Sequence, residues 1–230
     1  MIPTAGTLDI CGYHIQPLLK IKDVKQLRKE VGLVFQFPEY QLFEETIEKD
    51  IAFGPKNFGV EETEASQLVR NILPVVGLDE SYLDRSPFEL SGGQKRRVAI
   101  AGILVLDPKV LVLDEPTAGL DPQGAKEMMT LFMRLNREQN KTVLLVTHDM
   151  EHVMKYCDHV IVLDHGAVKQ TSDVKTFFEH PEWIVNIGIN PPSIIRLKMR
   201  LKEAGFDIPD EIIDEDGLLK CIKRQVKIHE

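Results

Sequence analysis

Short apolar runs alternate with longer segments of helical spacing in the second half of the chain. Val110 to Leu113 and Thr142 to Thr147 have the pattern of buried strands, which are typical of sheets covered by helices on both faces. Ser91 to Asp107 and Asp121 to Asn140 are long enough to form helices, and Val160 to Leu163 closes the series. This alternation predicts an α/β fold with a mostly parallel sheet.

Local signals mark the starts of three predicted helices. Ser91 precedes two glycines at the first start, Asp121-Pro122 pairs an N-cap with a first-turn proline at the second, and Asp149 caps the third. Ser and Asp side chains accept hydrogen bonds from the unpaired N–H groups of a first helical turn, and proline has the φ angle that this turn needs. We therefore expect each helix to begin at one of these residues.

The N-terminal region has a different pattern. Thr7 to Ile10 alternates as a strand does, Gly12 interrupts it, and Val31 to Phe35 is a second β-rich run that ends at Gln36. A polar, basic stretch from Lys20 to Glu30 separates the two runs. The region is therefore expected to contain short strands and turns.

Two further segments differ from this strand–helix core. Residues 37–90 are acidic, contain few β-branched runs and carry several Gly and Pro breakers, so we expect a small helical subdomain there. The core is then formed by residues 1–36 and 91–180, and residues 181–230 form a C-terminal extension. One amphipathic helix, ended by Gly205, is predicted in this extension from Ile194, Leu197, Leu201 and Ala204.

Length and composition limit the possible functions. The 230 residues amount to one generous domain, or a core with an appendage, at roughly 150 residues per domain. The formal net charge of −8 disfavours a nucleic-acid partner bound through its phosphates. Three cysteines lie far apart, which argues against a disulfide framework or a zinc cluster. The longest apolar run, Val98 to Leu106, is far shorter than the ~20 residues that span a bilayer.

The strongest chemical motif is Leu90-Ser91-Gly92-Gly93-Gln94 at a predicted helix start. The first N–H groups of a helix lack internal partners and carry the positive end of its dipole, so they attract phosphate. Glycines let a phosphate approach the backbone closely, and the Ser91 hydroxyl adds a donor. An ordinary glycine-rich turn with Ser91 as its N-cap is the alternative.

Two adjacent carboxylates, Asp114 and Glu115, follow the apolar run that ends at Leu113. Ligands of open α/β sheets bind at the carboxyl ends of the strands. We therefore expect Asp114 to hold Mg²⁺ and Glu115 to act as the general base that polarises the attacking water. A solvated acidic turn after a core strand is the alternative.

His148 and Gln36 stand at the ends of two other predicted strands. We expect His148 to reach the γ-phosphate of a nucleotide and to hold the hydrolytic water. Gln36 carries a neutral amide, which can contact Mg²⁺ and water without adding charge. A single histidine at a strand end is more often a surface or capping residue, and a single glutamine there says almost nothing about function.

Taken in order, these segments resemble the ATPase subunits of ABC transporters over about residues 3–180. The resemblance implies a P-loop NTPase-like (RecA-like) fold, ATP and Mg²⁺ as ligands, and ATP hydrolysis as the activity. It also implies that the signature segment and Asp121 contact ATP. Five family motifs have counterparts: the Q-loop at Gln36, the signature at Leu90 to Gln94, the Walker B strand at Val110 to Glu115, the D-loop at Ala118 to Asp121, and the switch histidine at His148.

A finer resemblance lies in Phe35 to Thr46 and Asp50 to Pro55, which look like energy-coupling factor (ECF) transporters and most like the second ATPase of their heterodimer. It implies uptake of a vitamin, a similar micronutrient or a metal ion, at the cytoplasmic face of a prokaryotic cell membrane. The implied partners are a sister ATPase, a transmembrane coupling subunit and a substrate-binding membrane subunit. Phe37, Leu42 and Phe43 become candidates for the surface that receives the coupling helices, with core packing as the alternative.

One family motif, the phosphate loop G-x-x-x-x-G-K-[S/T], has no counterpart in this sequence. In the family it precedes a segment that resembles Ile2 to Thr7, so we expect Met1 to fall just downstream of it, with the first strands also missing. A truncated gene model, a partial gene or a cloned fragment is the simplest account. Because that loop supplies the backbone N–H cradle and the lysine for the phosphates, we expect no ATPase activity from this chain alone.

Two other functions stay open at this point. A non-catalytic remnant that only binds partners is favoured by the missing phosphate loop. An ABC ATPase of DNA repair or translation is disfavoured by the net charge of −8 and by the ECF-like stretch at residues 35–55. The partners that co-purify with the chain distinguish the three functions.

Overall fold

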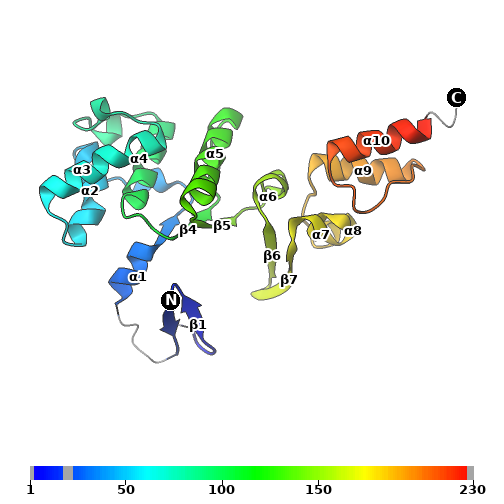
Figure 1. Ribbon diagram of the computed structural model, residues 1–230, viewed down its shortest axis with the longest axis horizontal. Helices are drawn as coiled ribbons and strands as arrows, with labels where there is room; N and C mark the ends of the chain where they lie inside the picture. The colour runs from blue at the N-terminus through cyan, green and yellow to red at the C-terminus, as the bar shows by residue number, and fades with distance from the viewer. Residues whose placement is uncertain (1–2, 18–22, 227–230) are drawn as a thin grey trace. The chain divides into compact units, whose positions relative to one another are not determined.

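The computed structural model describes residues 3–17 and 23–226, in two compact units, Met1–Val146 and Thr147–Glu230 (Figure 1). The residues Ile2 and Lys20 to Lys22, which belong to segments discussed above, lie outside the described residues. Each unit is described by itself.

A parallel sheet forms the centre of the first unit. Its strands are β3 (Val31–Val34), β4 (Val110–Asp114) and β5 (Thr142–Val146), in the order β3-β4-β5. Val34 lies opposite Leu113, and Asp114 lies opposite Val146. The carboxyl ends of all three strands therefore meet at one edge, as the predicted α/β fold requires.

A small antiparallel hairpin precedes this sheet. Its strands β1 (Leu8–Ile10) and β2 (Tyr13–Ile15) are joined by Cys11 and Gly12, with φ angles of 49° and 81°. Two residues with positive φ form a tight hairpin turn whose twist matches that of the strands. The predicted break at Gly12 is this turn. Helix α1 (Val24–Glu30) then leads into β3.

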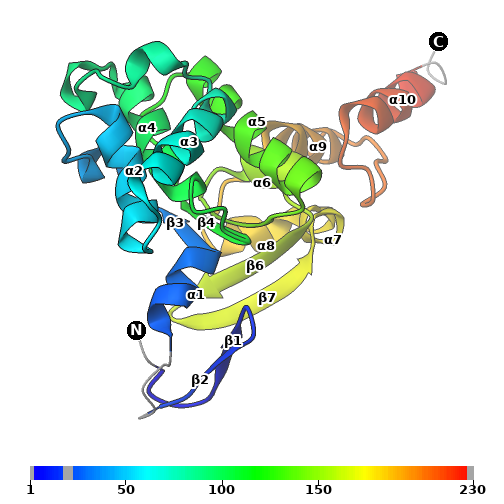
Figure 2. The ribbon, with the colours of Figure 1, turned by 60° about the vertical axis from the view of Figure 1, so that its left-hand side comes forward.

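Residues 37–90 are helical, as predicted. The group of α2, α3 and α4 is seen together in Figure 2. Pro74, one of the Gly and Pro breakers of this segment, separates α3 from a short 3-10 turn. The elements within residues 37–90 are η1 (Pro38–Gln41), α2 (Ile47–Asn57), α3 (Glu62–Ile72), η2 (Pro74–Val76), η3 (Glu80–Tyr82) and η4 (Pro87–Glu89), and α4 (Gly92–Leu104) follows this segment.

One continuous core joins these helices to one face of the sheet. Ile51 of α2, Val98 of α4 and Leu111 of β4 are buried in it. Phe132 and Leu135 join them from α5 (Pro122–Gln139), which begins at the predicted Asp121-Pro122 cap. Burying a side chain of this size contributes about 1.5–3 kcal/mol, so this core is the main source of stability in the unit.

The opposite face of the sheet is not covered in the same way. Leu33 is 40% exposed, Leu144 50% and Val146 55%. The prediction that Thr142 to Thr147 is a buried strand is therefore wrong, and β4 is fully buried on one face only. Successive residues of a strand point to opposite faces, and the core helices of this unit cover one of them.

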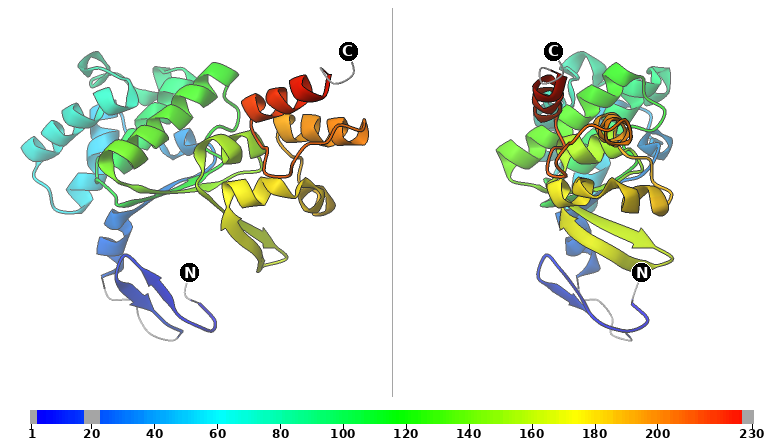
Figure 3. Two further views of the ribbon diagram at one scale, coloured as in Figure 1. Left: turned by 45° about the vertical axis from the view of Figure 1, so that its right-hand side comes forward. Right: turned by 90° about the vertical axis from the view of Figure 1, so that its right-hand side faces the viewer.

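The second unit contains an antiparallel hairpin and a series of helices (Figure 3). The strand predicted at Val160 to Leu163 is present as β6, but it pairs antiparallel with β7 in a sheet separate from the parallel one. Its turn, His165-Gly166, has φ angles of 48° and 77°, which suit a tight hairpin. The elements are α6 (Met150–Tyr156), β6 (His159–Asp164), β7 (Ala167–Asp173), α7 (Val174–Glu179), α8 (Pro181–Asn186), α9 (Ser193–Glu203) and α10 (Glu215–Val226).

The helices of the second unit have their own core. Phe177 and Phe178 of α7 are buried together with Ile184 of α8 and Ile195 of α9. The amphipathic helix predicted from residue 194 is α9, and Gly205, with a φ angle of 94°, follows its end. No described helix combines the length and the apolar character that a membrane span needs.

Candidate functional site

The signature segment opens α4. The Ser91 hydroxyl oxygen accepts a hydrogen bond from the Gln94 backbone N–H at 3.4 Å, and the Ser91 N–H donates to the Gln94 side chain at 3.0 Å. The amide nitrogen of Gln94 also donates to the Tyr82 hydroxyl at 3.0 Å. This reciprocal capping box fixes the start of the helix. The N-cap role of Ser91, given above as an alternative, is thus confirmed, and it does not consume the hydroxyl proton.

The backbone at this helix start is accessible. Gly92 and Gly93 are exposed, and a Cβ atom added to either would have no neighbour within 4 Å. The first turn of α4 carries no acidic residue. The N–H groups therefore present an uncompensated positive dipole end to solvent, which is the requirement for binding a phosphate.

The two carboxylates lie at the end of β4, as predicted. Asp114 is the last residue of the strand and shares a face with Val112, because alternate residues point the same way. Glu115 follows with a φ angle of 46°, and its N–H donates to the Val146 carbonyl at 2.9 Å. This bond continues the hydrogen-bond ladder between β4 and β5. The positive φ angle of Glu115 then turns the chain away from the sheet. Such a left-handed non-glycine residue at a strand end stores local strain, as functional sites often do.

Gln36 lies at the same edge of the sheet. It follows β3 by two residues, and the next residue, Phe37, turns the chain with a φ angle of 57°. Because β3 and β4 are parallel neighbours, Gln36 and Asp114 both stand at the carboxyl edge. A carboxylate and an amide oxygen suit Mg²⁺, which usually takes one or two carboxylates together with phosphates and water. Among the described residues no group of three or more His, Cys, Asp or Glu gathers as a metal site, and Mg²⁺ does not require one.

Asp121 serves as a helix cap in this structure. Its carboxylate accepts a hydrogen bond from the Gly124 N–H at 2.8 Å and so begins α5. The side chain is exposed. Capping does not exclude a contact between Asp121 and ATP, but the structure shows only the capping role.

His148 belongs to the second unit, just before α6. The neighbouring Asp149 caps that helix, accepting from the N–H groups of Glu151 at 2.9 Å and His152 at 3.2 Å. The two units are described separately, so the convergence of His148 with Asp114 and Glu115 stays a prediction.

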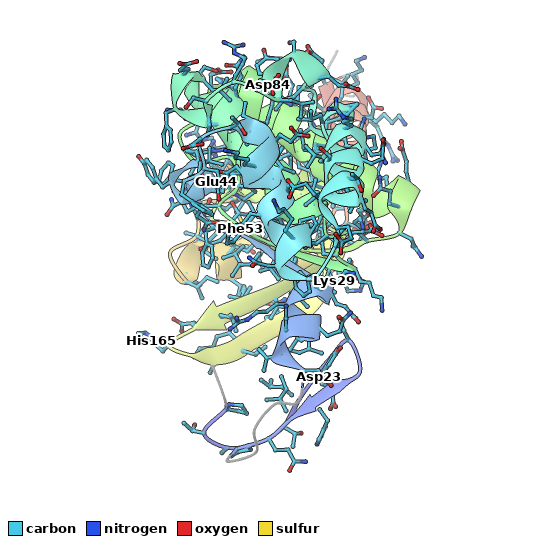
Figure 4. All side chains as sticks on the ribbon, turned by 90° about the vertical axis from the view of Figure 1, so that its left-hand side faces the viewer. Asp23, Lys29, Glu44, Phe53, Asp84 and His165 are labelled. Atoms are coloured by element: carbon cyan, nitrogen blue, oxygen red, sulfur yellow. The ribbon has the colours of Figure 1, made fainter. Side chains whose placement is uncertain are left out.

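An exposed aromatic surface lies on the helical region beside the Gln36 segment. Phe43, 57% exposed, and Phe53, 45% exposed, meet edge to face with their ring centroids 4.9 Å apart. Phe37 and Tyr40 form a second exposed aromatic pair, with ring centroids 6.0 Å apart, in the segment between Gln36 and Phe43. Figure 4 labels Phe53 near Glu44. Leu42 is 8% exposed and belongs to the core, so for this residue the packing alternative is correct. We call Phe37, Tyr40, Phe43 and Phe53 the aromatic surface.

The loop that carries Phe43 is held in place by one carboxylate. Asp50 accepts hydrogen bonds from the N–H groups of Phe43 and Glu44, both at 2.9 Å. Phe37 and Phe43 were predicted from the sequence as surface candidates, whereas Tyr40 and Phe53 were not. Phe53 lies on the opposite side of α2 from the buried Ile51, so the helical period of this segment could have predicted that Phe53 is exposed.

Comparisons with known proteins agree with this arrangement. Residues 1–118 match the family model described as ABC transporter. The chain is 51% identical to the energy-coupling factor transporter ATP-binding protein EcfA2 of Enterococcus faecalis, over 98% of this chain and 78% of that protein. It is 50% identical to the EcfA2 protein of Lactiplantibacillus plantarum, over 97% of this chain and 76% of that protein.

Solved structures show the same relationship. The structure of cbiO1 from Clostridium perfringens, described as part of the ABC transporter complex cbiONQ, is 40% identical, with a TM-score of 0.64 over 80% of this chain and 73% of that one. The ATP-binding cassette MJ0796, in a post-hydrolysis state with ADP and Pi, is 29% identical, with a TM-score of 0.62 over 76% of this chain and 75% of that one. The accessible start of α4 and the carboxylate pair at the end of β4 are therefore features of an ABC-type ATPase. This chain belongs to the ABC transporter family and is an ATP-binding and ATP-hydrolysing subunit of the energy-coupling factor type.

Proposed function

We propose that this chain is one of two ATPases that drive the uptake of a micronutrient, a vitamin or a metal ion, through an ECF transporter. The observation that carries the proposal is the accessible, uncompensated N-terminus of α4 at Ser91-Gly92-Gly93, in the same unit as the carboxylates that end β4. The first feature suits a nucleotide phosphate, and the second suits the metal and the water that hydrolysis needs.

Each site residue has a distinct role in this proposal. Asp114 and Gln36 would hold Mg²⁺, which neutralises charge on the phosphate oxygens when it is bound. Glu115 accepts a proton from the attacking water, and His148 orients that water and contacts the γ-phosphate. General-base catalysis of this kind contributes about 10²–10⁴-fold to a rate.

The signature segment acts on the nucleotide of the sister ATPase. Gly92 and Gly93 offer their backbone N–H groups, and Ser91 its hydroxyl proton, to a phosphate held mainly by the other subunit, while Gln94 fixes the helix start through the capping box beside that phosphate. Asp121 completes the ATP contacts at the same subunit boundary. This composite arrangement makes the two ATPases depend on each other.

The proposed domain organisation follows from these roles. Residues 1–36 and 91–180 form the nucleotide-binding core, residues 37–90 the helical subdomain, and residues 181–230 the C-terminal extension. The aromatic surface contacts the transmembrane coupling subunit, because exposed aromatic side chains held on a fixed loop suit an apolar partner. The chain then sits on the cytoplasmic face of the membrane and reaches the substrate-binding subunit only through its partners.

Co-purification tests this proposal. The tagged chain, expressed with the sister ATPase and the two membrane subunits, should be recovered with all three from detergent extracts. A complex variant with Phe43→Ser and Phe53→Ser should lose the membrane subunits but keep the sister ATPase. Recovery of a nucleic-acid or ribosome complex in place of the membrane subunits would contradict the proposal.

The missing phosphate-loop motif favours a second candidate function for the chain as printed, that of a partner-binding subunit without turnover. Loss of a single oxyanion donor lowers a rate by about 10²–10³-fold, and the absent loop supplies several donors at once. We therefore expect the purified chain, assayed alone with MgATP, to release no phosphate above background. Robust Mg²⁺-dependent turnover would overturn this expectation.

A further inference from the structure

Arg96, in the second turn of α4, is a buried charge with an unusual set of partners. Only 3% of its side chain is exposed. Its Nε and Nη2 atoms donate to the two carboxylate oxygens of Glu39, both at 3.0 Å. Glu39 lies in η1, three residues after Gln36, and 15% of its side chain is exposed. Burial alone would raise the pKa of Glu39, but the hydrogen bonds and charge of Arg96 hold it below its ordinary value.

The other side of the same guanidinium binds a different segment. Its Nη1 atom donates to the Ala118 carbonyl at 2.8 Å and to the Pro116 carbonyl at 3.4 Å. These two carbonyls belong to the turn that starts at Glu115, whose own carbonyl accepts the Ala118 N–H at 3.0 Å. One planar side chain thus joins the segment after Gln36 to the segment after Glu115.

Phe37 makes a second connection between these two segments. The Arg96 guanidinium carbon lies 5.7 Å from the centroid of the Phe37 ring, in cation–π geometry. On the other segment, a Cβ atom added to Gly119 would lie 3.2 Å from Cε1 of Phe37. Since Gly119 has a φ angle of 73°, a larger residue would be strained there as well as crowded.

The adjacent arginine shows that these partners do not follow from position on the helix alone. Arg97 donates to the Val76 carbonyl at 2.8 Å and to Glu127 at 2.7 Å, and it contacts neither of the two segments. A buried guanidinium is stable only when it is paired and fully hydrogen-bonded. Arg96 meets this condition by spanning two loops, and a lysine has a single donor group that could not bind both sides.

We propose that Arg96 is a positioning residue that couples the segment 37–41, which carries part of the aromatic surface, to the Glu115 turn. The proposal rests on the proposed function, in which that surface contacts the transmembrane subunit and Glu115 acts as the base. A displacement of Glu39 or Phe37 by the membrane partner then moves Arg96, and with it the carbonyls that hold the Glu115 turn. In this proposal Arg96 acts through its hydrogen bonds to the two segments and not on ATP itself.

Amide hydrogen exchange on the purified chain tests the connection directly. Tyr40, whose N–H donates to the Phe37 carbonyl, reports on the first segment; Ala118 and Leu120, which donate to the Glu115 and Thr117 carbonyls, report on the second. Arg96→Met should speed amide exchange in both segments by about tenfold, because each segment loses a charged hydrogen-bond partner. Arg96→Lys should retain protection at Tyr40 but lose it at Ala118.

The decisive variant is Glu39→Gln, which changes only the first segment. If Arg96 couples the two, exchange at Ala118 and Leu120 also rises, although Glu39 does not contact them. If exchange rises at Tyr40 alone, the connection is refuted. Arg97→Met is the matched control, since it removes an ion pair and a carbonyl bond on the same helix; faster exchange at Ala118 in this control would also overturn the proposal.

The assembled transporter supplies the functional readout. Arg96→Met and Glu39→Gln should raise the amount of ATP hydrolysed per substrate molecule transported by about tenfold while the KM for ATP changes by less than about twofold, because the nucleotide contacts are intact. An unchanged ratio in both variants would reject the coupling role even if the exchange data support the connection. If no transporter assembles with the parent chain, the proposed function fails, and the exchange experiment still decides the connection.

Discussion

The two faces of the parallel sheet in the first unit differ sharply. On one face Val34, Leu111 and Leu113 are completely buried beneath the core helices. On the other face Leu33, Leu144 and Val146 are 40–55% exposed, although they are equally apolar. The same strands form both faces, so the difference in burial comes from the elements that pack against each face.

The two faces of the sheet therefore contribute to different properties, the covered face to the stability of the unit and the other face to the candidate chemistry. The covered face belongs to the continuous core, where each side chain adds to the free energy of unfolding. Asp114 shares the other face with Val112, and Glu115 follows at the carboxyl edge. The candidate catalytic groups are therefore placed where the core does not enclose them, and changes on the two sides should affect different properties.

The largest effect is expected from Leu111→Ala on the covered face. Removing a fully buried leucine side chain leaves a cavity and should lower the free energy of unfolding by about 2–5 kcal/mol. Urea denaturation followed by circular dichroism measures this change. A loss below about 1 kcal/mol would mean that the two faces do not differ as described.

In an assembled transporter whose version of this chain also carries a phosphate loop, Glu115→Gln at the carboxyl edge should lower ATP hydrolysis by about 10²-fold or more while ATP still binds, because the amide cannot accept the proton of the attacking water. Phosphate release and nucleotide binding measure the two properties separately. Glu127→Gln, a carboxylate on α5 that pairs with Arg97, is the control and should keep normal turnover. Near-normal turnover of Glu115→Gln would reject this residue as the base.

A smaller effect is expected from Glu39→Gln, which leaves the buried Arg96 charge without a counter-charge. The free energy of unfolding should fall by about 1–3 kcal/mol at neutral pH. The pKa of Glu39 is lowered in the folded state, so its contribution is present above the ordinary Glu pKa and is lost as the pH falls through the folded value. The difference between parent and variant should therefore shrink below about pH 4. A difference that is constant down to pH 2 would contradict the charged pairing.

The smallest effect is expected from Leu144→Ala on the exposed face, the matched partner of Leu111→Ala. A half-exposed side chain outside the core should change the free energy of unfolding of the isolated chain by about 0.5 kcal/mol. The same denaturation experiment gives the value. A loss as large as that of Leu111→Ala would remove the distinction between the two faces.

The fold was largely predictable from local signals. Asp121-Pro122, Ser91 and Asp149 cap helices where the sequence placed them, because capping depends on a few neighbouring atoms. The burial of β5 was predicted wrongly, because the apolar composition of a strand does not say which of its faces is covered. The pairing of β6 with β7 was also not predicted, since polar β7 carries little strand signal.

The residue types of the candidate site could be predicted from the sequence better than their arrangement in space. The motifs identified Asp114, Glu115 and Gln36, and parallel pairing puts them at one edge. For Leu42 the sequence left a binding surface and core packing both open, and the structure buries its side chain in the core. Nothing in the sequence indicated Arg96, whose partners Glu39 and Ala118 lie 57 and 22 residues away along the chain.

By itself, the sequence determined the family, most of the strand and helix pattern, and the candidate groups that we propose to act on a phosphate. These properties depend on short motifs and on the periods of local structure, which a few adjacent residues carry. Only the tertiary structure decided which face of the sheet is buried, that Phe43 meets Phe53, and that one arginine joins two loops. Those properties depend on contacts between residues far apart in the chain, and the physical reason is that burial and pairing of a side chain are set by everything that packs around it.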